Sequence, residues 1–162
     1  MPNANRELTL RPATPADRDF LMKVFASTRA EELTVLGDAG LIETFVKMQF
    51  DAQQHTYSGI YPNAESSIIL LGDQPIGRLL VDRGAGAIRL VDIALLPEFR
   101  ASGTGSMLLK QLIDEAVESG RSLLLSVYQF NPALRWYERH GFSKVAEDGL
   151  YIQMQLGRTS AQ

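Results

Sequence analysis

The chain has no cysteine, few histidines and no long apolar run, and each absence removes a class of function. Without cysteine, the chain cannot form a disulfide framework, a thiolate metal site or a cysteine nucleophile. The two histidines, His55 and His140, are far apart in the sequence and make a poor metal-binding set, so no metal is expected. No apolar run approaches the roughly 18 residues that span a bilayer, so no membrane partner is expected.

The charge balance and the amino-terminal residues narrow the partners and the compartment. A formal net charge of −3 disfavours general nucleic-acid binding and does not favour a strongly acidic acceptor. Residues 1–10 are polar and lack the basic-then-apolar pattern of a secretory signal, so we expect a cytoplasmic protein. The length of 162 residues and the hydrophobic content of 45% fit one domain with a core, over 1–162, with a disordered tail at 157–162.

Strand-like and helix-like segments alternate along the chain, which predicts a mixed α/β fold. Strands are expected at 8–11, 67–71, 76–81, 87–96, 122–127, 142–145 and 151–156. Helices are expected to begin at 14 and after 40, and to cover 103–119 and 132–140. We expect 55–65 to be an irregular loop. The strand 151–156 is a candidate sheet edge, and a homodimer through an edge or a helix is left open.

The most informative segment is a glycine-containing turn between the strand 87–96 and the helix 103–119. A helix start presents unpaired backbone N–H groups and behaves as a partial positive charge. Gly103 and Gly105 remove side chains that would block those groups, and Arg100 adds a positive charge, so the turn suits a pyrophosphate. Alternatively, the glycines only permit a tight connection. The third glycine of the dinucleotide fingerprint and the Gly-Lys-Ser/Thr of a Walker loop are absent, so another phosphate ligand is indicated.

Two motifs together resemble a known family. Arg100-x-x-Gly103-x-Gly105, after a strand ending in Leu95-Leu96-Pro97, resembles the acyl-CoA signature of the GNAT N-acetyltransferase superfamily. The block from Asn131 to Phe142, which contains Tyr137-Glu138, is similar to that family's second motif. The order and separation of the motifs also fit, and the resemblance covers about 67–156 well.

The resemblance implies a fold and a binding mode. The fold would be a central, mostly antiparallel, splayed sheet flanked by about four helices. Acetyl-CoA, as co-substrate, would lie between the strands 87–96 and 122–127, with Asn131 near its pantetheine or adenine end. The pantetheine arm would meet backbone groups of Ile93, Ala94 and Leu95. The pyrophosphate would meet Arg100 and the main-chain N–H groups of Ala101, Ser102, Gly103, Thr104, Gly105 and Ser106.

Two residues are candidates for acid–base chemistry. Tyr137 stands where the family has its frequent general acid, and a phenol with a pKa of about 10 stays protonated at neutral pH. Alternatively, it is a core aromatic. Asp92 shares a strand face with apolar residues and is the best candidate base, because an acid in such surroundings needs a partner or a task. It could instead be a structural aspartate that pairs with Arg78 or Arg89. Some members of the family have a glutamate that acts as the general base near the position of Ser126, and this chain lacks it.

These patterns predict an N-acetyltransferase that moves an acetyl group from acetyl-CoA to a primary amine by direct attack. The acceptor could be a small molecule or a protein amino group. Tyr57, Tyr61 and Tyr128 are candidates for lining the acceptor side, although such tyrosines also serve simply as packing. His55, in the predicted loop, is a further candidate base, but the pattern favours a surface histidine. The alternative class is a non-catalytic acyl-CoA-binding sensor, which would keep Arg100 and Gly103 but need no acid at Tyr137.

Overall fold

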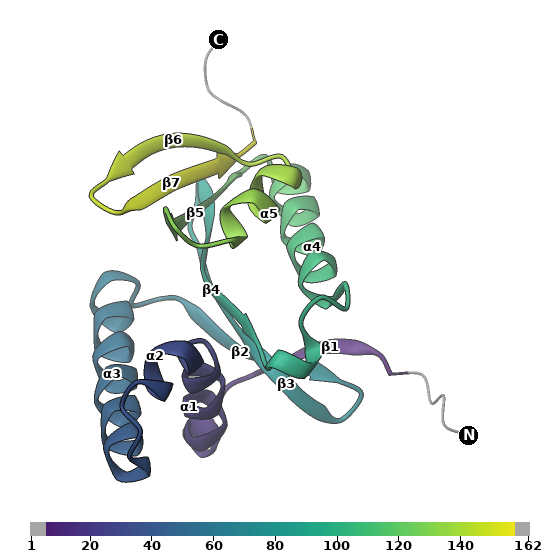
Figure 1. Cartoon of the computed structure of the whole chain (residues 1–162). Helices are drawn as coiled ribbons and strands as arrows, with labels where there is room; N and C mark the ends of the chain where they lie inside the picture. The colour runs from purple at the N-terminus through teal and green to yellow at the C-terminus, as the bar shows by residue number, and fades with distance from the viewer. Residues whose placement is uncertain (1–5, 158–162) are drawn as a thin grey trace. The chain divides into compact units, whose positions relative to one another are not determined.

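Apolar residues at helical and strand spacing build a seven-stranded, mostly antiparallel open sheet with helices packed on it (Figure 1). The computed structural model describes residues 6–157, so the predicted tail beyond Gly157 lies outside the described residues. The strand order is β1-β2-β3-β4-β5-β7-β6. The chain divides into two units, 6–80 with 92–105 and 81–91 with 106–157. The strands β3 (Gln74–Arg83) and β4 (Ala87–Leu95) contribute to both units.

The first unit packs helices on an antiparallel strand pair. The pair consists of β1 (Leu8–Pro12) and β2 (Glu65–Leu71). Between them the chain forms α1 (Arg18–Ser27), α2 (Ala30–Thr34) and α3 (Ala39–Ile60). The core cluster consists of Leu21 and Phe25 from α1, Phe50 from α3 and Ile68 from β2. The helical spacing of the α1 residues therefore predicted a buried face correctly.

A buried ion pair fixes the entry to α1. Asp17 accepts hydrogen bonds from both terminal nitrogens of Arg11, at 2.8 and 2.9 Å, and from the backbone N–H of Thr14 at 2.8 Å. The Arg11 guanidinium and the Thr14 N–H stabilise the carboxylate and hold the pKa of Asp17 well below its usual range. A short 3-10 turn, Pro15–Asp17, then leads into the helix, so the helix start predicted at Thr14-Pro15 is confirmed.

Two expectations for this unit were wrong. The segment predicted as a loop from His55 onward belongs to α3, which continues to Ile60. The helix α2 was not predicted at all. The misses have a physical cause: no residue of α3 after Phe50 is buried, and α2 has only five residues with Leu33 alone buried, so neither stretch offers an apolar repeat that periodicity could detect.

The second unit is built around α4 (Thr104–Ser119) and β5 (Ser122–Tyr128), followed by α5 (Ala133–Arg139), β6 (Ser143–Asp148) and β7 (Tyr151–Leu156). Parallel pairing of β4 with β5 joins Ala87–Arg89 to Ser122–Leu124, whereas β5 pairs with β7 as far as Tyr128. The pairing described between β4 and β5 therefore involves only the first three residues of each strand. The expected edge at 151–156 was wrong, because β7 lies between β5 and β6.

Candidate functional site

The strand–turn–helix segment after β4 contains two residues with positive backbone φ angles. A 3-10 turn, Pro97–Phe99, follows the strand, and α4 begins at Thr104. Between them, Ala101 and Gly103 both have left-handed backbone conformations, with φ of 58° and 86°. Left-handed residues in a turn before a helix start are common in backbone anion-binding sites, which is the type of site expected at this turn.

The backbone at position 103 favours glycine, and the space beside it is open. A φ of 86° is a conformation that side chains rarely adopt, and a Cβ built on Gly103 would meet nothing within 4 Å. The turn is braced by Ser102, whose hydroxyl donates to the Phe99 carbonyl at 2.7 Å and lies 3.1 Å from the Thr104 hydroxyl. The turn therefore has open space at Gly103 and is braced by the Ser102 side chain.

Arg100 anchors the turn from behind. Its Nε donates to the Leu95 carbonyl at 2.9 Å, and its Nη2 donates to the Ser27 hydroxyl at 3.1 Å. Ser27 is the last residue of α1, where a cation also meets the negative end of the helix dipole. The guanidinium therefore links the turn that follows β4 both to the end of that strand and to the end of α1.

The last residues of β4 are held in place by a glycine that sequence reasoning missed. Ile93, Ala94 and Leu95 are partly buried, and the Leu96 N–H donates to the Ile76 carbonyl at 2.8 Å. A Cβ on Gly77 would lie 2.3 Å from the Ala94 carbonyl oxygen and 3.1 Å from the Leu95 Cα. Only glycine permits this approach. The available signal was a glycine inside a buried strand run, which often marks a close backbone contact.

Asp92 faces a buried arginine across the same unit. The Asp92 Oδ2 lies 3.9 Å from the Nη1 of Arg78, an ion-pair distance longer than a hydrogen bond. That Nη1 instead donates to the Gln54 side-chain oxygen on α3 at 2.9 Å. The Asp92 side chain is 26% exposed and that of Arg78 is 5% exposed, so the pair reaches solvent on the Asp92 side. Of the partners predicted for Asp92, the structure selects Arg78.

The surroundings of Asp92 suit a proton acceptor. Burial raises the pKa of the Asp92 carboxyl, while the positive charges of Arg78 and Arg29 and a hydrogen bond from Ile93 oppose the rise. The net direction is upward, toward the range in which a general base works. The cluster is cationic overall, since two arginines accompany one carboxyl group, although the chain as a whole is acidic.

The aromatic candidates of the predicted loop lie on or beside α3. The Tyr57 ring lies under Arg78, with the guanidinium carbon 5.9 Å from the ring centroid, so Tyr57 joins the Asp92 cluster. Tyr61 ends the helix, and its N–H donates to the Tyr57 carbonyl at 2.7 Å. His55 is exposed on the same helix. Of the three, the structure brings Tyr57 to the cluster.

Tyr137 belongs to the second unit and is buried in an aromatic group. Its ring centroid lies 5.0 Å from that of Trp136 and 5.7 Å from that of Phe142. The indole N–H of Trp136 donates to the Ser106 hydroxyl at 3.1 Å. This bond ties α5, which carries Tyr137, to the first turn of α4. Tyr137 and Asp92 lie in different units.

Two other predicted positions make local hydrogen bonds. The Asn131 side-chain oxygen accepts from the Ala133 N–H at 2.9 Å and so supports the start of α5. The Ser126 hydroxyl bonds to Gln153 at 2.7 Å and to Arg89 at 3.2 Å. Among residues 6–157, no group of three histidine or acidic side chains is placed to hold a metal ion, and no helix is long and apolar enough to cross a membrane.

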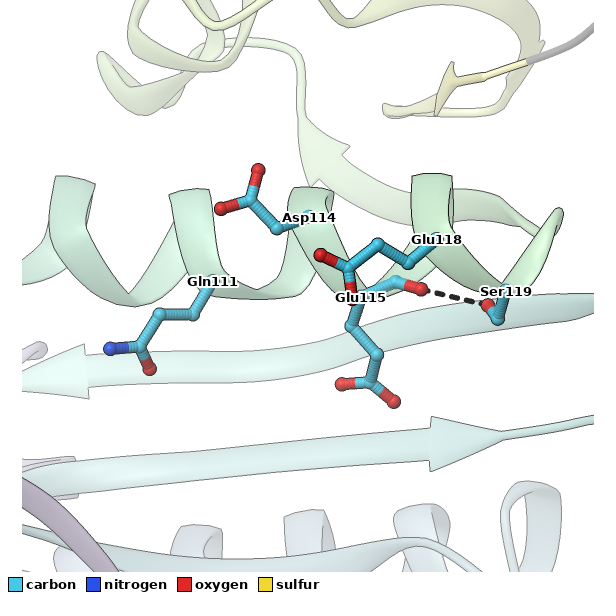
Figure 2. Close-up of a pocket in the computed structure, with 5 residues that line it drawn as sticks. All are labelled: Gln111, Asp114, Glu115, Glu118 and Ser119. Atoms are coloured by element: carbon cyan, nitrogen blue, oxygen red, sulfur yellow. Dashed lines mark hydrogen bonds between the residues drawn. The ribbon is translucent and has the colours of Figure 1, made fainter.

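A hollow on the outer face of α4 is polar and carries no acid–base pair. Figure 2 shows its lining residues, Gln111, Asp114, Glu115, Glu118 and Ser119. The Ser119 hydroxyl donates a hydrogen bond to the Glu115 backbone carbonyl at 2.8 Å (Figure 2). The Glu115 carboxylate is paired with Arg83 at 2.7 Å, and that arginine holds the pKa of Glu115 below its usual value. The hollow is a solvated helix face.

The chain is similar to known acetyltransferases in both sequence and structure. A family model described as an acetyltransferase (GNAT) domain matches residues 63–144, slightly more than half of the chain. The fold is similar to that of the PaiA N-acetyltransferase from Thermoplasma acidophilum in complex with coenzyme A, with a TM-score of 0.70 and 17% identity over 94% of this chain and 99% of that one. An acetyltransferase from Thermus thermophilus matches with a TM-score of 0.66 and 24% identity over 93% and 96%. A GNAT family acetyltransferase from Elizabethkingia anophelis with acetyl-CoA bound matches with a TM-score of 0.56 and 16% identity over 93% and 98%.

Proposed function

The chain belongs to the GNAT acetyltransferase family, and from this premise we propose that it transfers the acetyl group of acetyl-CoA to a primary amine by direct attack. The observation that carries the proposal is the turn with left-handed Ala101 and Gly103 between β4 and α4. Its open glycine side and its helix start fit a phosphate group. Acetyl-CoA supplies the acetyl group as a thioester.

The residues of the turn and of β4 would hold the co-substrate. Main-chain N–H groups of 101–106 would bind the pyrophosphate, and Arg100 would keep the turn against β4. Backbone groups of 93–95 would bind the pantetheine arm, and an N–H near Leu95 would polarise the thioester carbonyl. Asn131 would line the pantetheine or adenine end.

The chemical step needs two proton movements. The ammonium form of the acceptor loses one proton to Asp92, because an alkylamine with a pKa near 10.4 is otherwise protonated at neutral pH. The amine nitrogen then forms the C–N bond as the C–S bond breaks. Its second proton is lost to solvent, and the leaving thiolate takes a proton from Tyr137, which solvent restores. Asp92 then releases its proton to solvent, so the products are an N-acetylamine, the free thiol of CoA and one proton.

The proposal is tested by measuring free CoA released from acetyl-CoA with a panel of primary amines, with mass spectrometry of the acetylated product. Turnover with at least one amine supports the enzyme. Tight binding of acetyl-CoA without turnover of any amine, free or peptide-borne, contradicts it and leaves the acyl-CoA sensor.

The role of Asp92 is tested in the same assay with Asp92→Asn. Loss of the base should lower kcat by about 10²–10⁴-fold and remove the acid limb of the pH profile. Burial raises the pKa of Asp92. As the pH is lowered, the wild-type rate should therefore begin to fall at a pH higher than that at which an ordinary carboxyl group titrates. An unchanged acid limb in Asp92→Asn would assign the proton transfer to another group.

A further inference from the structure

Arg78 is a buried cation whose hydrogen-bonding capacity the protein does not fill. The residue is 4% exposed within β3, next to the buried Leu79 and Leu80. Its Nη1 is bonded to Gln54, and the Asp92 carboxylate stands off at 3.9 Å. Its Nε has no hydrogen-bond partner in the part of the chain that the structure describes. A donor and much of a positive charge are therefore left unmatched.

Such an arrangement is costly if it serves the fold alone. A guanidinium remains protonated in proteins, so it cannot escape the penalty by losing its charge. A buried ion pair held at 3.9 Å, with one buried donor unfilled, is a poor contributor to stability, and an apolar residue of similar volume would serve the core as well or better. The side chain is also held in one position, by Gln54 on one terminal nitrogen and by the Tyr57 ring beneath the guanidinium. A fixed cation with an empty donor is typical of an anion-binding site.

The position of Arg78 indicates which anion it meets. It lies beside Asp92, to which the proposed function assigns the acceptor amine, and this pair opens to solvent on the Asp92 side. An acceptor whose amine faces Asp92 would carry its neighbouring atoms toward Arg78, the residue ion-paired to that carboxylate. A carboxylate matches the planar fork of a guanidinium and supplies the missing charge. The amine and the carboxylate must then be close together in the acceptor.

We infer that the acceptor is a free α-amino acid, whose carboxylate binds Arg78 while its amine faces Asp92. In an α-amino acid, one carbon separates the two groups, which suits two protein side chains that lie side by side. A lysine side chain in a protein has no carboxylate next to its amine, and the carboxyl group beside a protein amino terminus is consumed in an amide. The inference rests on the proposed function and narrows its acceptor class.

The first test uses the wild-type protein and matched acceptors. Free CoA release is measured with phenylalanine, phenethylamine and phenylalaninamide, and with leucine and isoamylamine. We expect kcat/KM to be about 100-fold higher for each amino acid than for its counterparts that lack a carboxylate, because those do not fill the free donor of Arg78. Equal or better turnover of the amines overturns the inference but supports the proposed function. Acetyl-CoA binding without turnover of any acceptor overturns both.

The second test changes the arginine. Arg78→Met removes the charge at similar volume and should raise KM for phenylalanine by about 100-fold, with little change for phenethylamine. Arg78→Lys keeps the charge without the fork and should fall between Arg78→Met and wild type. Arg83→Met, at the exposed end of the same strand, is the matched control and should leave both acceptors unchanged. Acetyl-CoA affinity by calorimetry should match wild type in all three.

The variants also separate a binding role from a structural one. A structural arginine would lower the rates for phenylalanine and phenethylamine together, along with the midpoint of thermal unfolding. A carboxylate-binding arginine affects the amino acid alone. The inference would be refuted if the wild type had equal kcat/KM for phenylalanine and phenethylamine and Arg78→Met lowered both values to the same extent.

Discussion

Gly77 offers a sharp test of how the fold positions the proposed acyl-CoA strand. Gly77→Ala would place a methyl group 2.3 Å from the Ala94 carbonyl oxygen, whereas ordinary contacts begin at 3.4 Å. The obstacle is backbone, so it cannot rotate away as a side chain would. The end of β4 must then move away from β3 by about 1 Å, with strain of the kind seen on overpacking a core.

The displacement should affect function more than stability. Overpacking typically costs about 1–3 kcal/mol, against a total stability of about 5–15 kcal/mol for a domain, so the variant should still fold. A shift of about 1 Å in groups that position a substrate can cost about 100-fold in rate. We therefore expect a loss of that order in kcat/KM for acetyl-CoA, with a modest shift in the urea midpoint.

The assay combines urea unfolding with initial rates of CoA release at varied acetyl-CoA. Gly86→Ala is the matched control, because a Cβ at Gly86 meets nothing within 4 Å and the residue has no left-handed backbone conformation. That variant should behave as wild type in both measurements. A Gly77→Ala protein with native kcat/KM would show that the 94–95 backbone does not need its position, and the reasoning about β4 would be refuted.

Three further predictions concern the cradle, the proposed acid and the ion pair at Asp17. Gly103→Glu should abolish acetyl-CoA binding in calorimetry, because it forces a side chain at a φ of 86° and adds negative charge beside the pyrophosphate; native affinity in a folded variant would remove the turn from the cofactor site. Tyr137→Phe keeps the ring contacts with Trp136 and Phe142. It should lower kcat by about 10-fold or more and leave the acetyl-CoA affinity nearly native. Unchanged turnover would show that Tyr137 is not the acid. Arg11 holds the pKa of Asp17 below its unfolded value of about 3.9, so the ion pair stabilises the fold above that pH and its contribution is lost as the pH falls further. Asp17→Asn should therefore lower the free energy of unfolding at pH 7 and flatten the acid side of its pH dependence, and identical acid limbs for the two proteins would argue against this pair.

The parts of the molecule that sequence predicted well are those set by local patterns. Apolar spacing in 103–119 predicted α4, and glycine with a left-handed conformation at 103 follows from the need to turn sharply from a strand into a helix. The strands expected at 67–71 and 76–81 are also confirmed as β2 and β3, and the tight turn between them has Gly72 at a φ of 62°. In each case the information lies within a few residues of the feature it determines.

The parts that sequence did not predict depend on contacts between distant segments. Gln54, Arg78 and Asp92 come from a helix and two strands, and nothing in their spacing indicates that they form one cluster. The close approach of Gly77 to Ala94 depends on strand register, which the sequence alone does not determine. The position of β7 between β5 and β6 also depends on which strands pair. A strand with an exposed residue such as Tyr151 has the local pattern of an edge strand, although β7 is an inner one.

The most direct test of the account is calorimetric titration of the wild-type protein with acetyl-CoA. The turn between β4 and α4 predicts saturable binding at one site per chain, with a dissociation constant in the micromolar range, on the order of 10⁻⁶ M. Absence of measurable binding to a folded sample would contradict the assignment of 101–106 as a pyrophosphate cradle and, with it, the proposed acetyl transfer.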